Sequence, residues 1–170
     1  GTRRHSFGNL VGHVKEVSDM KSLAAWTNEQ FDPRLSWADV DWVRERWGGK
    51  FILKGIMEVE DALLAVQHGA DAIVVSNHGG RQLDGAPSSI RALPAIVEAV
   101  GDKTEVWMDS GIRSGQDVLK AWALGARGTM IGRAMAYGLG AMGEAGVTRA
   151  LQIVHKELDV KMAFCGHTQL

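Results

Sequence analysis

The sequence contains one cysteine, Cys165, three prolines and no long apolar stretch among its 170 residues. A single cysteine excludes an internal disulfide, so the framework is not that of a small, cross-linked secreted protein. No segment approaches the roughly 20 consecutive apolar residues that a membrane-spanning helix needs. A formal net charge of −1 gives no electrostatic reason to expect binding to nucleic acid.

The sequence also lacks a pattern typical of a metal site or a secretory leader. Five histidines are scattered without carboxylate or thiol partners at ligand spacing, and most are expected at the surface: His5, His13, His68, His155 and His167. Arg3 and Arg4 are not followed by an apolar segment, so we expect no signal peptide. The composition, 45% hydrophobic and 23% charged, is that of an ordinary globular domain. We therefore expect a cytoplasmic protein without a metal.

After residue 48 the sequence is predicted to form four units, each with a short apolar strand, a loop and an amphipathic helix. The strands are expected at residues 51–53, 72–75, 106–108 and 129–131. The helices are expected at residues 59–68, 93–100, 115–124 and 144–158. Because proline is unfavourable inside a helix but tolerated in its first turn, Pro94 predicts that the second helix begins near residue 93. The uncharged segment 134–143 is expected to form a buried helix. Strands that alternate with helices indicate a parallel sheet.

The most informative segment is residues 76–84 (SNHGGRQLD), which directly follows the predicted strand at 72–75. A histidine at a strand end is by itself more often structural than catalytic, and a loop arginine is more often a solvated charge. Here a candidate proton acceptor, His78, lies three positions from a planar cation, Arg81. This pair suits a substrate that carries a removable proton beside a carboxylate.

Two architectures contain such units, an open doubly wound sheet and a βα barrel. Charged or small residues follow all four strands, among them Lys54, Ser76, Asp109 and Gly132. A doubly wound sheet would gather its ligand groups mainly at one switch point, whereas a TIM barrel carries them at the C-terminal ends of its strands. We therefore predict an α/β fold of the TIM (β/α)8 type.

The number of units suggests only part of such a barrel. A complete barrel has eight strands and usually about 250 residues. Residues 36–170 are therefore predicted to be the C-terminal half of one, with about four βα units, within a longer enzyme. Residues 1–35 have no clear strand pattern and are expected to form a long, mobile loop segment.

Four motifs, in order, resemble the FMN-dependent L-2-hydroxy acid dehydrogenases and oxidases, the family of glycolate oxidase, mandelate dehydrogenase and flavocytochrome b2. They are residues 54–55 (KG), 76–84 (SNHGGRQLD), 109–113 (DSGIR) and 131–133 (IGR). Ser110 is a departure, since many relatives have glycine there. Residues 30–33 (QFDP) and 88–94 (SSIRALP) are most similar to the bacterial L-lactate dehydrogenase branch.

The resemblance implies oxidation of an L-2-hydroxy acid, L-lactate first among the candidates, to the 2-oxo acid. Lys54 would lie against the N1 side of the flavin and stabilise negative charge on the reduced ring. Ser76 would hydrogen-bond the flavin. His78 would act as the base that takes the substrate hydroxyl proton, and Arg81 would bind the substrate carboxylate.

The same resemblance implies a cofactor-binding set in the last two loops. Asp109 would accept hydrogen bonds from the ribityl hydroxyls of FMN. The phosphate would be held by four further residues, as is usual for the last loops of such barrels: Gly111, Arg113, Gly132 and Arg133.

Other interpretations remain open from the sequence. Another FMN-binding barrel, such as a type 2 isopentenyl-diphosphate isomerase, would share the phosphate motifs but not the pair of His78 and Arg81. A half-barrel without activity could instead self-associate or bind phosphate or flavin weakly. We expect negligible activity from these residues alone, and either a homo-oligomer or association with the N-terminal half. In relatives the early loop can contact a membrane, so peripheral association of the whole enzyme with the inner face of the cell membrane is a further expectation.

Overall fold

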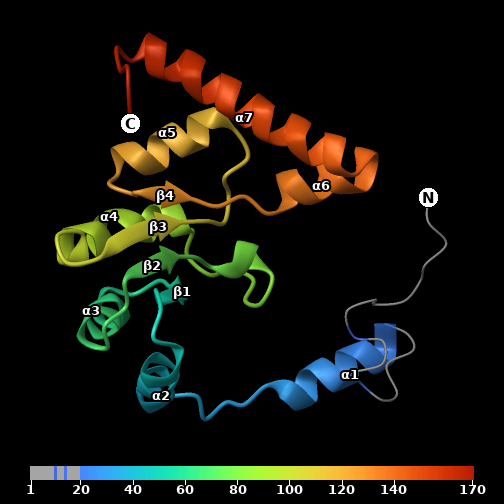
Figure 1. The fold of residues 1–170 in the computed structure, drawn as a ribbon, viewed down its shortest axis with the longest axis vertical. Helices are drawn as coiled ribbons and strands as arrows, with labels where there is room; N and C mark the ends of the chain where they lie inside the picture. Colours follow the sequence, from blue (N-terminus) through green and yellow to red (C-terminus); the bar gives the residue numbers. More distant parts are fainter. Residues whose placement is uncertain (1–9, 11–13, 15–19) are drawn as a thin grey trace. The chain divides into compact units, whose positions relative to one another are not determined.

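The computed structural model describes residues 10, 14 and 20–170, and the chain divides into two units, Gly1–Val40 and Asp41–Leu170. In the first unit, where we expect a loop, Met20–Gln30 form helix α1 (Figure 1). Leucine, alanine, methionine and lysine in this segment all favour the helical state, which explains the difference. The loop expected over residues 1–9, 11–13 and 15–19, together with His5 and His13, lies outside the described residues.

The second unit is built on a parallel sheet of four strands in the order β1-β2-β3-β4 (Figure 1). The strands are β1 (Ile52–Ile56), β2 (Ala72–Val75), β3 (Glu105–Met108) and β4 (Gly128–Thr129). Each predicted strand is present, although β4 ends before residues 130–131. Because the strand order follows the sequence with no reversal, the sheet lacks the switch point of a doubly wound fold. The predicted βα units of a barrel-type α/β fold are confirmed.

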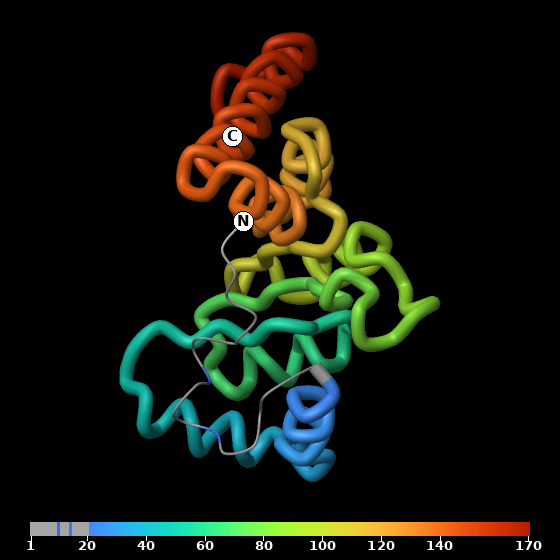
Figure 2. Tube along the Cα trace, turned by 90° about the vertical axis from the view of Figure 1, so that its right-hand side faces the viewer, coloured from blue at the N-terminus to red at the C-terminus, as the bar shows by residue number. Residues whose placement is uncertain are grey.

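Helices alternate with the strands and cover the sheet. They are α3 (Val59–Gln67), α4 (Ser89–Val100), α5 (Gly115–Ala123), α6 (Arg133–Met142) and α7 (Glu144–Phe164), and α2 (Trp37–Trp47) precedes β1. Helix α3 packs on α4, α4 on β2 and β3, and α5 on β4 and α7. Helices α6 and α7 lie side by side in both views (Figures 1 and 2).

The start of α4 differs from the prediction. The helix begins at Ser89 and contains Pro94, whereas we expect it to begin near residue 93. An internal proline removes one backbone hydrogen bond. The apolar face of α4 offsets this loss, because Leu93, Ile96 and Val100 are all at most 1% exposed.

The core centres on β2, which is buried along its whole length. The strand contacts α4 and pairs with β3, where Ile73 lies opposite Val106 and Val75 opposite Met108, both of which are also buried. A strand covered on both faces is expected to be a continuous apolar run, and residues 72–75 (AIVV) have that composition. This buried strand carries the SNHGGRQLD segment at its carboxyl end.

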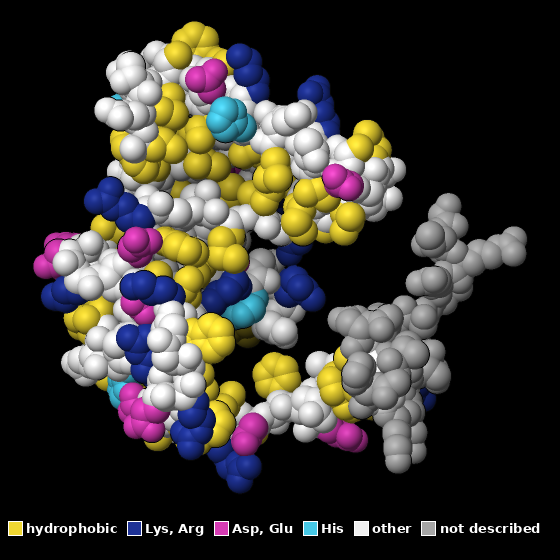
Figure 3. Space-filling view, in the orientation of Figure 1, with side chains coloured by type: hydrophobic (Ala, Val, Ile, Leu, Met, Phe, Trp, Pro, Cys, Tyr) yellow, Lys and Arg dark blue, Asp and Glu magenta, His cyan; other side chains and the backbone are white. Residues whose placement is uncertain are grey.

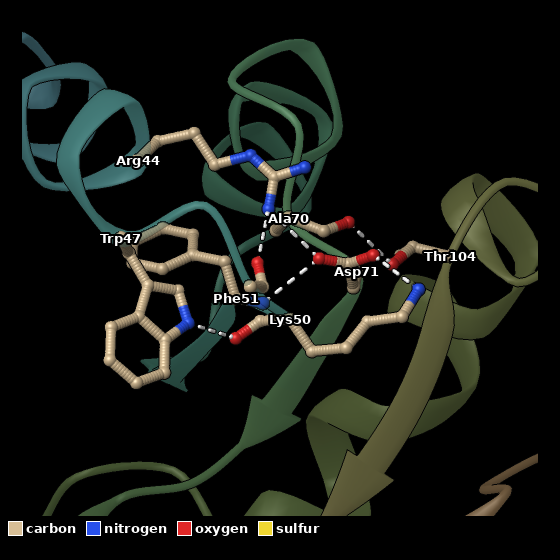
Figure 4. Close-up of polar contacts among 8 residues, drawn as sticks. Arg44, Trp47, Lys50, Phe51, Ala70, Asp71 and Thr104 are labelled. Carbon is tan, nitrogen blue, oxygen red and sulfur yellow. Dashed lines mark hydrogen bonds and ion pairs between the residues drawn. The ribbon is translucent and has the colours of Figure 1, made fainter.

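At the opposite end of the sheet, Asp71 fixes the start of β1 to the start of β2 (Figure 4). Its carboxylate accepts hydrogen bonds from Arg44 Nη1 at 2.9 Å, Lys50 Nζ at 2.8 Å and the Phe51 amide at 2.9 Å. The Asp71 amide in turn donates to the Phe51 carbonyl at 2.8 Å. Lys50, the Phe51 amide and Arg44 hold the pKa of Asp71 far below its usual value.

Helix α6 is not buried, contrary to the expectation for residues 134–143. Tyr137 is 74% exposed and Met142 is 62% exposed, and no residue of α6 is fully buried. The helix packs on α7 through small residues, since a Cβ at Gly138 would lie 2.5 Å from the Gly146 carbonyl oxygen. Close backbone approach leaves the larger side chains of α6 on the outside. None of the helices in the described part of the chain is long and apolar enough to cross a bilayer.

Candidate active site

The carboxyl ends of all four strands border one cleft of about 440 Å³. Lys54 lines the cleft from β1, and the loop after β2 provides His78, Gly79 and Arg81. The loop after β3 provides residues 109–113. The first turn of α6, entered from β4, forms the remaining wall. Because parallel strands end at the same edge, residues far apart in the sequence converge there. All five charged residues predicted for the site line the cleft: Lys54, Arg81, Asp109 and Arg113 on its β1, β2 and β3 sides, and Arg133 on its β4 side.

Lys54 and Asp109 form an ion pair within the cleft. Lys54 Nζ lies 3.1 Å from Asp109 Oδ2 and donates to Ser76 Oγ at 3.1 Å. Burial alone would raise the pKa of the Asp109 carboxyl. Hydrogen bonds from the two neighbouring serine hydroxyls and from Lys54 outweigh burial and hold that pKa below its usual value. Asp109 is therefore an ionised group that only accepts hydrogen bonds at neutral pH.

Ser76 lies beneath the cleft rather than on its surface. The residue is 1% exposed, and its hydroxyl oxygen also accepts a hydrogen bond from the His78 amide at 3.1 Å. Its hydroxyl thus joins Lys54 at the end of β1 to the loop that carries His78. The structure places Ser76 with the predicted site residues, but as a group that orients its neighbours.

His78 begins a short turn, η1 (His78–Gly80), at the end of β2. The side chain of Asn77 accepts from the Gly80 amide at 3.1 Å and donates to the Pro87 carbonyl at 3.1 Å, which holds both ends of the loop. The imidazole leans over β1, where a Cβ at Gly55 would lie 3.0 Å from His78 Cε1. Gly55 has a φ of 103°, so glycine is required there both for the backbone and for the ring above it.

Arg81 and Arg113 place two guanidinium groups at the cleft. In the part of the chain that the structure describes, neither side chain takes part in an ion pair or a hydrogen bond. A guanidinium carries five donors in a planar fork that matches carboxylate and phosphate oxygens. Both groups can therefore bind an anion without first losing a protein partner.

The other end of the cleft is formed by backbone and a third guanidinium. Gly132 precedes the first turn of α6, whose amide groups have no side-chain cap. Gly111 has a φ of 116°, and a Cβ there would meet nothing within 4 Å, so its backbone borders open space. Arg133 donates from Nη2 to the Gly79 carbonyl at 2.6 Å. Uncapped amides, an open glycine and nearby guanidinium groups are features of an anion site.

The structure brings together all nine residues that the sequence predicts for the site. Eight line the cleft, and Ser76 lies directly below it. Sequence reasoning missed Ser110, whose hydroxyl donates to Asp109 Oδ1 at 2.7 Å and accepts from the Gly79 amide at 2.9 Å. The one available signal was that serine stands where many relatives have glycine.

The chain matches the model of the FMN-dependent dehydrogenase family over residues 3–170. It belongs to that family. It is 51% identical to an L-lactate dehydrogenase of Caulobacter vibrioides over 162 residues, and 48% identical to one of Pseudomonas syringae over 168 residues. These alignments cover 95% and 99% of this chain but 42% and 44% of the relatives. The chain therefore spans less than half the length of these family members.

Solved structures of the family share the fold. A mandelate oxidase in complex with (S)-4-hydroxymandelic acid superposes with a TM-score of 0.82 at 46% identity, covering 86% of this chain and 41% of the oxidase. An (S)-mandelate dehydrogenase described as a monotopic membrane protein also has a TM-score of 0.82, at 39% identity, covering 91% of this chain and 41% of that protein. The FMN-dependent family and the barrel-type α/β fold predicted from the sequence are thus confirmed.

Proposed function

We propose that this chain carries the reactive face of an enzyme that oxidises an L-2-hydroxy acid, L-lactate first, to the 2-oxo acid with FMN. The observation that supports it best is the convergence of Lys54, His78 and Arg81 on one cleft from two neighbouring strands. The similarity to two L-lactate dehydrogenases, which are 51% and 48% identical to this chain, favours lactate over other 2-hydroxy acids.

The cleft residues fit FMN. The uncapped first turn of α6, with Gly111, Gly132, Arg113 and Arg133, offers amide and guanidinium donors to a phosphate dianion. Ionised Asp109 lines the cleft, and its carboxylate oxygens can accept hydrogen bonds from ribityl hydroxyls. FMN, when bound, supplies the two-electron acceptor for the reaction.

Lys54 provides a fixed positive charge beside the place proposed for the flavin. Its ammonium is held by Asp109 and Ser76, so its position is set before any ligand arrives. A cation fixed in this way stabilises negative charge without reorganisation during the reaction. Ser76 contributes by fixing both Lys54 and the His78 amide.

His78 and Arg81 are proposed to act on the substrate. Arg81 binds the carboxylate with two parallel hydrogen bonds and so fixes the C2 carbon in the cleft. His78 takes the proton of the C2 hydroxyl as the C2–H electron pair leaves for the acceptor, which gives the C2 carbonyl. The proton on His78 is then returned to solvent.

Flavin reduction by substrate tests this function. L-lactate, glycolate and (S)-mandelate are mixed anaerobically with the whole FMN-loaded protein, and loss of flavin absorbance is followed. We expect His78→Gln to retain FMN and to reduce the rate with L-lactate by roughly 10²- to 10⁴-fold, because a general base is lost. Flavin reduction at near wild-type rate in His78→Gln would overturn the role of His78. Absence of reduction by all three acids in the wild type would overturn the proposed reaction.

We also propose peripheral membrane contact of the whole protein. It is supported by the description of one solved relative as a monotopic membrane protein. Co-flotation with liposomes that contain anionic lipid is expected if the proposal holds, and recovery only in the dense fraction would contradict it.

A further inference from the structure

Ser110 has an unfavourable backbone conformation for a residue with a side chain. In the described part of the chain, positive φ angles outside glycine occur at two residues, His78 with 57° and Ser110 with 67°. Such angles are uncommon for residues that carry a Cβ, and they cluster where a function maintains them. Both of these residues lie at the cleft. Glycine would adopt the angle at residue 110 without strain.

The hydroxyl of Ser110 gives a reason for serine at this position. It donates to Asp109 Oδ1 at 2.7 Å and accepts from the Gly79 amide at 2.9 Å, while Ser76 Oγ lies 3.4 Å away. Since Asp109 can only accept, the hydroxyl proton must point to Asp109, which leaves the oxygen lone pairs for Gly79. Donation to a carboxylate also makes the hydroxyl oxygen a better acceptor.

Gly79, directly after His78, is bound through both of its backbone polar groups. Its amide donates to Ser110, and its carbonyl accepts from Arg133 Nη2 at 2.6 Å. A Cβ at Gly79 would lie 3.0 Å from the same guanidinium nitrogen. The loop after β2 is thus anchored to the loops after β3 and β4 at one residue.

We propose that Ser110 is a positioning residue that fixes His78 relative to Asp109 through the Gly79 amide. This inference rests on the role proposed for His78. In it, the Ser110 hydroxyl links Asp109, on the cofactor side of the cleft, to the loop that carries His78, on the proton-transfer side. Ser110 acts through Gly79 and Asp109 and does not itself react with substrate.

Two substitutions separate the hydroxyl from the backbone strain. Ser110→Gly removes both the hydroxyl and the strain, whereas Ser110→Ala removes the hydroxyl and keeps the strain. We expect Ser110→Gly to unfold at a higher temperature than Ser110→Ala. In both variants the Gly79 amide should exchange with solvent roughly two- to tenfold faster than in the wild type, the range for one net hydrogen bond.

The experiment uses the 170-residue chain labelled with ¹⁵N-glycine, and it measures amide exchange together with the imidazole resonances of His78. Both readouts should change in the two variants, while the Gly146 amide at the contact of α6 with α7 exchanges as before. Ser36→Ala is the matched control, because the Ser36 hydroxyl also donates to a carboxylate, Asp39 at 2.9 Å, outside this network. It should leave Gly79 and His78 unchanged.

Unchanged Gly79 exchange and unchanged His78 resonances in both Ser110 variants would overturn the proposal. Equal changes at Gly146 would also overturn it, because they would indicate general destabilisation. These readouts need neither FMN nor turnover. If the whole wild-type protein oxidised none of the three acids, the proposed function would be wrong. The effect of Ser110 on the Gly79 amide and the His78 ring would still be tested independently.

Discussion

At the scale of single residues, the cleft depends on glycines that admit a neighbouring side chain. Gly55 combines a φ of 103° with a His78 ring atom 3.0 Å from where a Cβ would be. Gly85 has a similar backbone, with a φ of 79°, but a Cβ there would meet nothing within 4 Å. The two positions thus separate the cost of the backbone angle from the cost of contact with His78.

Gly55→Ala and Gly85→Ala should each lower the free energy of unfolding by about 1 kcal/mol, because alanine is strained at positive φ. Only Gly55→Ala should also shift the His78 imidazole resonances and slow flavin reduction. Denaturant titration and NMR of the two variants check this. Identical His78 spectra in both variants would show that the ring does not depend on Gly55.

Arg113 and Arg133 are the residues on which binding of the FMN phosphate should depend. A hydrogen bond to a charged group is worth about 1.5–3 kcal/mol, so replacing both arginines with alanine should weaken FMN binding by at least roughly 100-fold. Lys120→Ala, at an exposed position of α5, is the control and should bind FMN as the wild type does. Quenching of flavin fluorescence on titration measures the affinity. Equal affinities for the double variant and the control would contradict the assignment.

At the scale of elements, the ends of β1 and β2 are fixed by different chemistry. The carboxyl ends carry the cleft, while the amino ends are joined by Asp71 to Arg44, Lys50 and the Phe51 amide (Figure 4). Contacts at the amino-terminal face of a barrel serve stability, since the active site lies at the opposite face. Pairing of Ile52 with Ala72 and of Lys54 with Val74 transmits that fixed start to the reactive end of β1.

Asp71→Asn should lower the melting temperature at pH 7 and reduce its dependence on pH. The pKa of Asp71 is lowered in the folded state, so its contribution is present above the unfolded value of about 3.9 and declines as the pH falls through the folded value. The difference between wild type and variant should therefore shrink below pH 4. Thermal melts between pH 2 and 7 test this, with Asp102→Asn, at an exposed turn, as control. A difference independent of pH would contradict the ionic role.

At the scale of the whole molecule, the described sheet has two strands with one unpaired side, β1 and β4. Apolar side chains are also exposed over α6 and α7 (Figure 3), including Tyr137, Leu139, Met142 and Leu151. Unpaired strand edges and contiguous apolar surface favour association with another chain.

We therefore expect the isolated 170-residue chain to be a homodimer or larger assembly, or to bind a complementary polypeptide of the same family. Multi-angle light scattering of the purified chain at several concentrations measures this. Added urea at a concentration below the unfolding transition should shift the assembly toward monomer. A monomer at all concentrations that does not bind hydrophobic dyes would contradict the expectation.

Several features followed from local sequence alone. Residues 72–75 could be recognised as a buried strand because a continuous β-branched run has few other stable environments. The start of α5 was also readable, since Ser114 and Asp117 form the capping box that their spacing predicts. Unusual side chains followed each strand, and parallel strands bring such positions to one edge, so a site at this edge could be predicted. The roles of the individual residues were implied by the resemblance of the four motifs to the family.

Other features were decided only by tertiary contacts. Helix α4 passes through Pro94 because burial of Leu93, Ile96 and Val100 outweighs a lost hydrogen bond, and no local rule includes that burial. The exposure of α6 depends on how closely Gly138 approaches Gly146 on the next helix. The link from Asp109 through Ser110 to Gly79 joins residues 30 positions apart in the chain by hydrogen bonds of fixed length, which only the assembled strand ends could set. The sequence by itself determined which chemical groups reach the cleft, because strand ends are locally encoded, whereas the packing of the loops decided which of those groups hold one another in place.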